Sequence, residues 1–251
     1  MSLPPIGIVI STYQRPDGKT PDLLKRTLNS VLNQTYNNWK LYLIGDHYIN
    51  NNEFESFCSL IPKEKLFSLN LPLSVERNRY PNGGIDLWHS GGTLAQMLGT
   101  EIAVNEGYDY VCALDHDEMW DSNHLELIAQ CIEDTKSLFI HTKSIHFDGS
   151  IIPSNITSND LYIKQRALPA QSIKSASCVN FKVIPLRRKD PLYFNNVRDA
   201  GDAYFLKQVN NLLDSNNLDS ILINKVTVIH DEEGYTKTLN KEEIEKVTSF
   251  N

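Results

Sequence analysis

The chain has 251 residues, of which 41% are hydrophobic and 22% are charged, so it can form one large α/β domain or two small ones. Its 31 acidic and 24 basic residues give a net charge of −7, which disfavours nucleic acid as the main partner. No apolar stretch approaches the roughly 18 residues of a membrane span, so we expect none.

The first part of the chain has the pattern of a β-α-β unit. Residues 5–10 form a short apolar run rich in β-branched residues, which is typical of a buried parallel strand. Thr20, followed by a proline and an acid, predicts the N-cap of a helix. We expect a second strand over residues 39–44, and a unit of this kind places its two strands side by side and parallel.

Helix and strand patterns alternate along the remaining sequence. We expect helices at 53–60, 93–106, 123–134, 200–213 and 240–247, and strands within 66–75, 108–114, 138–145, 178–184 and 225–229. Ser122 predicts the cap of the helix that follows it. Residues 77–92 hold four glycines and predict a long loop. This order of elements predicts an α/β fold with a mostly parallel sheet flanked by helices.

Polar residues follow the ends of three predicted strands. They are Thr12, Tyr13 and Arg15, then Asp46, and finally Asp115, Asp117 and Glu118. Open parallel sheets bind ligands outside the carboxyl ends of their strands, so we expect these side chains to form a site. The chain has no GxGxxG and no GxxxxGK[ST], which leaves a dinucleotide fingerprint and a P-loop unsupported.

Two aspartates two residues apart at a strand end can share one Mg²⁺ or Mn²⁺ ion with a diphosphate. Asp115 and Asp117 have this spacing, and such an ion would relieve the repulsion between their carboxylates. We expect His116, the residue between them, to face solvent.

Four stretches of the sequence resemble family 2 glycosyltransferases of the GT-A fold, in the nucleotide-diphospho-sugar transferase superfamily. The stretches are IGIVISTYQRP, LLKRTLNSVLNQTYNNWKLYLIGD, GYDYVCALDHDEMWDSNHLELI and RDAGDAYFLKQV, and they cover most of residues 5–210 in family order. The resemblance implies a single glycosyltransferase domain over residues 1–251. Its Rossmann-like nucleotide-sugar-binding half would be 1–121 and its acceptor-binding half 122–251.

The resemblance also implies roles for individual residues. Those matching donor-binding positions are Thr12, Tyr13, Arg15, Asp46 and Asp115; those matching metal ligands are Asp117, Asp115 and, late in the chain, His230. Asp202 matches the catalytic base, but the family's preceding Glu is Gly201 here, so Asp199 is a rival. On the acceptor side we expect Asp199, Glu118 and Trp120.

The activity that this resemblance implies is transfer of a sugar from a nucleotide-diphosphate donor, most simply a UDP-sugar, to an acceptor hydroxyl. Transfer would invert the anomeric carbon, use Mn²⁺ or Mg²⁺ at the DXD motif, and serve polysaccharide biosynthesis with a carbohydrate or lipid-linked saccharide acceptor. The absence of a Q-x-x-R-W motif argues against a processive synthase. Two alternatives remain open. One is a metal-dependent hydrolase built on Asp115, Asp117, His124 and His230, and the other is an inactive nucleotide-sugar-binding module.

The cysteines indicate where the protein works. The chain has four cysteines, at Cys58, Cys112, Cys131 and Cys178. No two of them have the CxxC spacing. We therefore expect free thiols in a reducing compartment, which predicts a cytoplasmic protein, either free or peripherally associated with the inner face of the membrane. The N-terminus lacks the charged and long apolar regions of a signal peptide.

Overall fold

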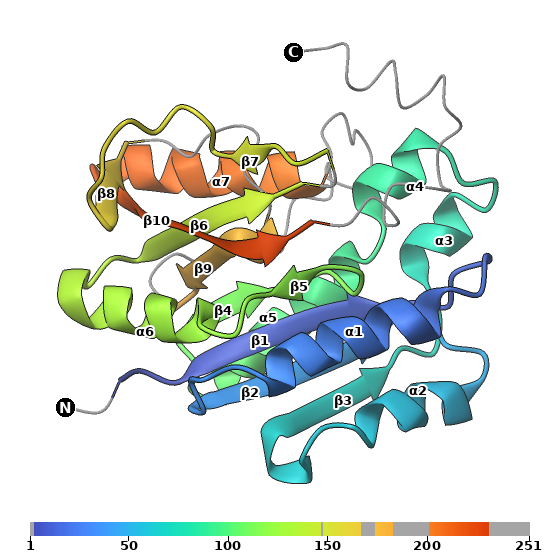
Figure 1. The fold of residues 1–251 in the computed structure, drawn as a ribbon. Coiled ribbons are helices and arrows are strands. Elements are labelled where there is room, and N and C mark those ends of the chain that lie inside the picture. Colours follow the sequence, from blue (N-terminus) through green and yellow to red (C-terminus); the bar gives the residue numbers. More distant parts are fainter. Residues whose placement is uncertain (1–2, 147, 167–173, 183–200, 231–251) are drawn as a thin grey trace.

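The computed structural model describes residues 3–146, 148–166, 174–182 and 201–230, and its centre is a ten-stranded sheet (Figure 1). The strands are β1 (Ile6–Thr12), β2 (Trp39–Gly45), β3 (Leu66–Asn70), β4 (Tyr110–Ala113), β5 (Met119–Trp120), β6 (Phe139–Ile145), β7 (Ile151–Ile152), β8 (Tyr162–Gln165), β9 (Ser177–Asn180) and β10 (Ser220–Ile229). The main path runs β3-β2-β1-β4-β9-β6-β10-β5, with β7 paired to β6 and β8 paired to β10.

The sheet is parallel in its first half and mixed in its second. Strand β1 pairs in parallel with both β2 and β4, and β3 continues this arrangement beyond β2. Strand β9 lies antiparallel between β4 and β6, whereas β10 runs parallel to β6. The predicted fold class, a mostly parallel sheet flanked by helices, is confirmed.

Helices cover both faces of the sheet. They are α1 (Thr20–Leu32), α2 (Asn51–Cys58), α3 (Val75–Arg79), α4 (Ile85–Ser90), α5 (Thr93–Asn105), α6 (His124–Thr135) and α7 (Gly201–Ser215), with 3-10 turns η1 (Lys63–Lys65) and η2 (Lys174–Ala176). Alternate residues of each strand point to opposite faces. In β1, Ile8 therefore packs in one core cluster with α1, α2 and α6, while Val9 packs in another beneath α5.

Most predicted elements appear within a few residues of their expected bounds, and several details differ. Residues 77–92 are not one long loop, because α3 and α4 fall largely within them. Such short helices lack the apolar period by which a helix is recognised in sequence. The helix after Ser122 has Asn123 as its N-cap, and the predicted helix at 240–247 lies outside the described residues.

Thr20 is also not the cap of α1, because the helix already begins at this residue. Its hydroxyl instead accepts a hydrogen bond from the Arg15 backbone N–H at 2.8 Å and donates to the Tyr13 carbonyl at 2.9 Å. Thr20 therefore closes the loop between β1 and α1, and this loop carries Tyr13 and Arg15.

The four cysteines are free, as we expected, and the structure shows that all four are buried. Among the helices in the described part of the chain, none combines the length and the apolar character needed to cross a bilayer.

Candidate functional site

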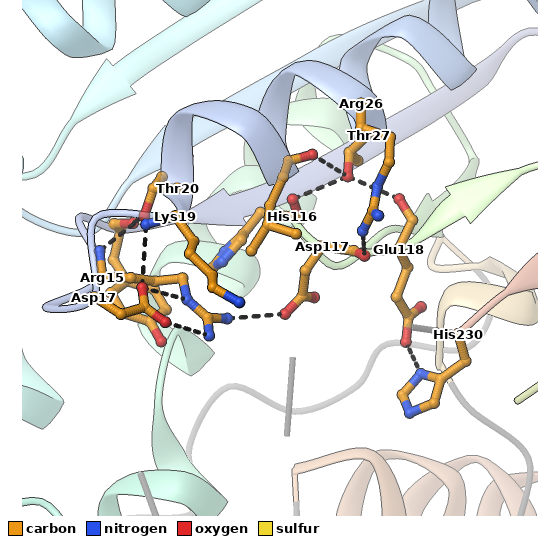
Figure 2. A network of polar contacts seen from close by, with 12 residues as sticks. Arg15, Asp17, Lys19, Thr20, Arg26, Thr27, His116, Asp117, Glu118 and His230 are labelled. Atoms are coloured by element: carbon orange, nitrogen blue, oxygen red, sulfur yellow. Dashed lines mark hydrogen bonds and ion pairs between the residues drawn. The ribbon is translucent and has the colours of Figure 1, made fainter. Parts of the chain in front are cut away.

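The turn after β4 carries the acidic cluster, and α1 holds its backbone in place (Figure 2). The Glu118 N–H donates to the Asp115 carbonyl at 3.1 Å, which closes the turn. The Thr27 hydroxyl has one proton and lies 2.9 Å from the His116 carbonyl and 2.7 Å from that of Glu118. Arg26 Nη2 donates to the Asp117 carbonyl at 2.9 Å. The side chains of this turn are therefore presented from a fixed backbone.

Each of the two aspartates of the acidic turn, Asp115 and Asp117, faces a cation of the protein. Asp117 Oδ2 lies 3.4 Å from Arg15 Nη1, and Asp115 Oδ1 lies 2.8 Å from Lys174 Nζ. The Asp115 backbone N–H also donates to the Ser175 hydroxyl at 3.1 Å. Positive charge from two separate segments thus offsets the repulsion between carboxylates that the sequence places so close together.

A second group surrounds Asp46 at the end of β2. Asp46 Oδ2 accepts from the Ser74 hydroxyl at 2.9 Å and from Arg77 Nε at 3.3 Å. The Arg77 guanidinium lies 3.6 Å from the centre of the Tyr13 ring, a cation–π contact. The Tyr13 and His116 rings form a T-shaped pair with their centres 5.0 Å apart. A continuous series of contacts therefore joins Asp46 to the acidic turn.

Helix α3, which supplies Arg77, is fixed to α5 by a buried carboxylate. Glu76 is 1% exposed and accepts a hydrogen bond from the Leu94 backbone N–H, in the first turn of α5, at 2.7 Å. Burial raises the pKa of Glu76, while the Leu94 contact works in the opposite direction. A carboxylate at a helix N-terminus is favourable, so this bond helps to hold Arg77 against Asp46.

Glu118 and His230 form a buried acid–imidazole pair. Glu118 is 2% exposed, and its Oε1 is bonded to Nδ1 of His230, which follows β10. Figure 2 shows the Asp117 and Glu118 carboxylates pointing away from α1, with His230 beyond Glu118. Burial is the main cause that raises the pKa of Glu118 to about 7, and the contact with His230 opposes it.

This pair predicts a pH-dependent stability. The pKa of Glu118 is about 7 in the folded chain against an ordinary 4.5, so the folded state binds the proton more tightly. The stabilisation from protonation is present below the ordinary pKa and lost as pH rises through about 7. Relative to Glu118→Gln, the wild type should lose on the order of 1–3 kcal/mol over this range. Urea unfolding of both proteins measures the difference, and parallel pH curves would contradict it.

Three of the named side chains are buried where we expected them to be accessible. Thr12 is 1% exposed, and its hydroxyl bonds to the Tyr48 hydroxyl at 2.7 Å. Its side chain therefore links the end of β1 to the segment after β2 rather than facing a donor. Trp120 is 4% exposed and donates to the Ser175 carbonyl, so its ring belongs to the core and not to an acceptor surface. His116 is 7% exposed because it packs on Tyr13, so its predicted solvent-facing position is wrong.

His124, a ligand in the hydrolase alternative, is fully buried. It stacks on Trp120 with ring centres 4.3 Å apart, and its Nδ1 bonds to the Thr227 hydroxyl at 2.7 Å. Burial lowers its pKa to about 3. The ring is a core histidine packed in the hydrophobic interior, so the predicted metal set that includes it does not form.

The predicted base falls at the edge of the described residues. Asp202 is the second residue of α7, and its side chain lies outside what the structure describes. Asp199 also lies outside the described residues. Both assignments therefore stay predictions.

The donor atoms at the acidic turn suit a hard divalent cation. Asp115 and Asp117 supply oxygen, and their side chains are 30% and 16% exposed. Within the described residues no group of three or more His, Cys, Asp or Glu could enclose a metal ion. Mg²⁺-type ions usually take one or two carboxylates and complete their shell with water and substrate phosphates. The residues present therefore fit an ion that binds together with a diphosphate.

Sequence reasoning missed several residues of this site. They are Asp17, Thr27, Ser74, Arg77, Lys174 and Ser175. Asp17 carries a weak signal, because an acid before glycine is typical of a turn. The others have no local signal, since their partners are distant in the sequence.

Comparison with known proteins gives one relative along nearly the whole chain. A glycosyltransferase of Acanthamoeba polyphaga mimivirus, itself uncharacterized, is 34% identical over 237 residues, which cover 92% of this chain and 95% of that protein. An uncharacterized protein of Sinorhizobium fredii is 29% identical over 130 residues, which cover 52% of this chain and 12% of that protein. No family model matches the chain.

Solved structures of TarS from S. aureus share the fold. TarS 1–349 has a TM-score of 0.60 at 12% identity, over 90% of this chain and 60% of that one. Its complex with UDP has a TM-score of 0.60 at 11% identity, over 97% and 63%. Its complex with UDP-GlcNAc has a TM-score of 0.58 at 12% identity, over 91% and 58%. This chain therefore spans about 60% of the TarS fragment.

Proposed function

Because the chain belongs to the same glycosyltransferase family as its mimivirus relative, we propose that it transfers a sugar from a UDP-sugar to an acceptor hydroxyl, with inversion and with a divalent cation. The observation that carries the choice of nucleotide is Asp46. Its Oδ2 is bonded to Ser74 and Arg77, whereas its Oδ1 is buried and has no hydrogen-bond partner among the described residues. A buried acceptor without a partner costs about 1–3 kcal/mol, and the N3–H of uracil would satisfy it.

Other side chains of the site suit the remainder of the donor. The Tyr13 ring, stacked on Arg77, offers an aromatic face beside Asp46. Arg15 would neutralise the diphosphate with its guanidinium. Asp115 and Asp117 would hold Mn²⁺ or Mg²⁺, which when bound supplies neutralisation of the leaving diphosphate. The TarS complexes with UDP and UDP-GlcNAc support a donor of this class.

Asp202 is our candidate for the base in a single displacement. Its carboxylate would accept the proton of the acceptor hydroxyl while the hydroxyl oxygen bonds to the anomeric carbon. The bond from that carbon to the diphosphate oxygen breaks, and UDP leaves with the electron pair. Asp202 lies at the start of α7, where a family base is expected from the sequence.

The acceptor is proposed on the sequence alone, and the location on the state of the cysteines. We propose a carbohydrate or lipid-linked saccharide acceptor in polysaccharide biosynthesis. The four free cysteines support a reducing, cytoplasmic setting.

Calorimetric titration with UDP, CDP and GDP, with and without Mn²⁺, tests the nucleotide. We expect UDP to bind more tightly than CDP or GDP. We also expect UDP to reach its full affinity only when Mn²⁺ is present. In Asp46→Asn the amide oxygen can keep the Ser74 and Arg77 contacts, which turns its NH₂ towards the base. An NH₂ group suits N3 of cytosine and opposes the N3–H of uracil, so the UDP-over-CDP preference should fall by at least about tenfold.

Ser74→Ala is the matched control for this substitution. It removes one partner of Asp46 Oδ2 but leaves both carboxylate oxygens as acceptors. We expect it to weaken UDP and CDP alike. An unchanged base preference in Asp46→Asn would contradict the assignment of Asp46 to the base.

A non-catalytic nucleotide-sugar-binding module is the second candidate, and Gly201 favours it, because the family's Glu is missing there. This candidate predicts the same nucleotide binding with no turnover on any acceptor array.

A further inference from the structure

Arg15 lies between the carboxylates of Asp17 and Asp117 (Figure 2). Its Nε and Nη2 donate to the two oxygens of Asp17, at 3.2 and 3.1 Å, which is a bidentate contact. Its Nη1 lies 3.4 Å from Asp117 Oδ2. The Arg15 side chain is 4% exposed and that of Asp17 is 8% exposed, so water screens this contact little.

The loop is built so that Asp17 holds the guanidinium. The Gly18 N–H donates to the Arg15 carbonyl at 3.1 Å, closing a turn in which Gly18 has a φ of +72° that suits glycine. The Lys19 N–H donates to Asp17 Oδ1 at 3.1 Å, which fixes the carboxylate. Asp17 is therefore a rigid anchor, and the shorter contacts of Arg15 are with Asp17 rather than with Asp117.

This arrangement divides one positive charge between two acids. Asp117 Oδ2 is the oxygen that Arg15 approaches, and Asp117 is also our main candidate for holding a divalent cation. Two cations near one carboxylate repel each other, so a free cation at Asp117 must overcome the Arg15 charge. A diphosphate reverses this balance, because it brings negative charge that Arg15 and the cation can share.

We propose that Arg15 is the resident counter-ion of Asp117 and competes there with a free divalent cation, and that Asp17 is the positioning residue that limits this competition by drawing the guanidinium towards itself. The cation and the nucleotide diphosphate then bind cooperatively, because the diphosphate offsets the repulsion between Arg15 and the cation, and the cation takes over Asp117 and so leaves Arg15 available to the diphosphate. This inference rests on the proposed function.

The test is the affinity for Mn²⁺ alone, measured by electron paramagnetic resonance at low ionic strength, followed by the same titration in saturating UDP. Arg15→Met keeps an apolar stem but removes the charge, so Mn²⁺ alone should bind about tenfold more tightly. The gain in Mn²⁺ affinity on adding UDP should shrink by about the same factor, because the coupling depends on Arg15.

Asp17→Asn should act in the opposite direction. Without the Asp17 charge, the guanidinium is drawn to Asp117, and Mn²⁺ alone should bind several-fold more weakly. Asp22→Asn is the matched control, because it removes the same charge from an exposed position in the first turn of α1. We expect its Mn²⁺ affinity to stay within about twofold of wild type. A substitution that merely loosened the fold would not shift the two variants in opposite directions.

Melting temperatures show which variants fold, and Arg15→Gln replaces Arg15→Met if the latter does not. Opposite shifts in the two variants, with Asp22→Asn unchanged, support the inference. Equal Mn²⁺ affinity in wild type and the Arg15 variant overturns it, even if UDP binds normally. A wild type that binds Mn²⁺ but no UDP overturns the proposed function instead.

Discussion

Replacing Asp202 by Asn should lower the rate of sugar transfer about 10²–10⁴-fold, the usual contribution of a positioned general base. Asn keeps the size of the side chain but cannot accept the proton of the acceptor hydroxyl. Donor binding should change by no more than about twofold, because the base acts in the transition state and not in donor binding. Transfer of a radiolabelled sugar to a glycan array measures the first quantity, and calorimetry with UDP and Mn²⁺ the second.

Asp199→Asn is the matched control, since Asp199 is the rival assignment and carries the same charge. A large loss of transfer rate in Asp199→Asn, with normal turnover in Asp202→Asn, would assign the base to Asp199 instead. If wild type transfers no sugar to any member of the array yet binds UDP, the non-catalytic module is the better description.

Asp117→Ala should weaken UDP binding in the presence of Mn²⁺ by about 100-fold or more. Asp117 is the expected main cation ligand, and losing even a supporting contact of a metal site commonly costs 10–100-fold. Binding of UDP without metal should change far less, so the Mn²⁺-dependent part of the affinity should nearly vanish. Titration with Mn²⁺ and then with EDTA separates the two parts.

Asp121→Ala controls for the loss of one negative charge close to the acidic turn. Asp121 is exposed and lies only four residues further along the chain. We expect UDP and Mn²⁺ to bind this variant as they bind wild type. An Mn²⁺ dependence retained in Asp117→Ala would assign the cation to other residues.

The part of the site that follows parallel strands was predictable from the sequence. Asp46 and Asp115 come directly after apolar runs, and the carboxyl ends of β2, β1 and β4 lie at one edge because these strands pair in parallel. Hydrophobic period and chain order decide this arrangement, and both are visible in a sequence.

The finer placement of side chains was not predictable, because it depends on contacts between distant segments. Trp120 belongs to the two-residue strand β5, and only its pairing with β10 decides which way the ring points. Arg77 comes from a five-residue helix in a stretch with the composition of a loop. Lys174 meets Asp115 only because β9 pairs with β4 and so brings η2 to the acidic turn.

The pairing of β10 with β5 has a consequence for how the protein is made. The Asp121 N–H bonds to the Thr227 carbonyl, and Glu118 bonds to His230, which is 112 positions later in the chain. During synthesis, the acidic turn leaves the ribosome well before β10 and His230, which make these contacts with it. The proposed donor site therefore gains its contact between Glu118 and His230 only after residue 230 has been synthesised, so the nascent first half presents the acidic turn without that contact.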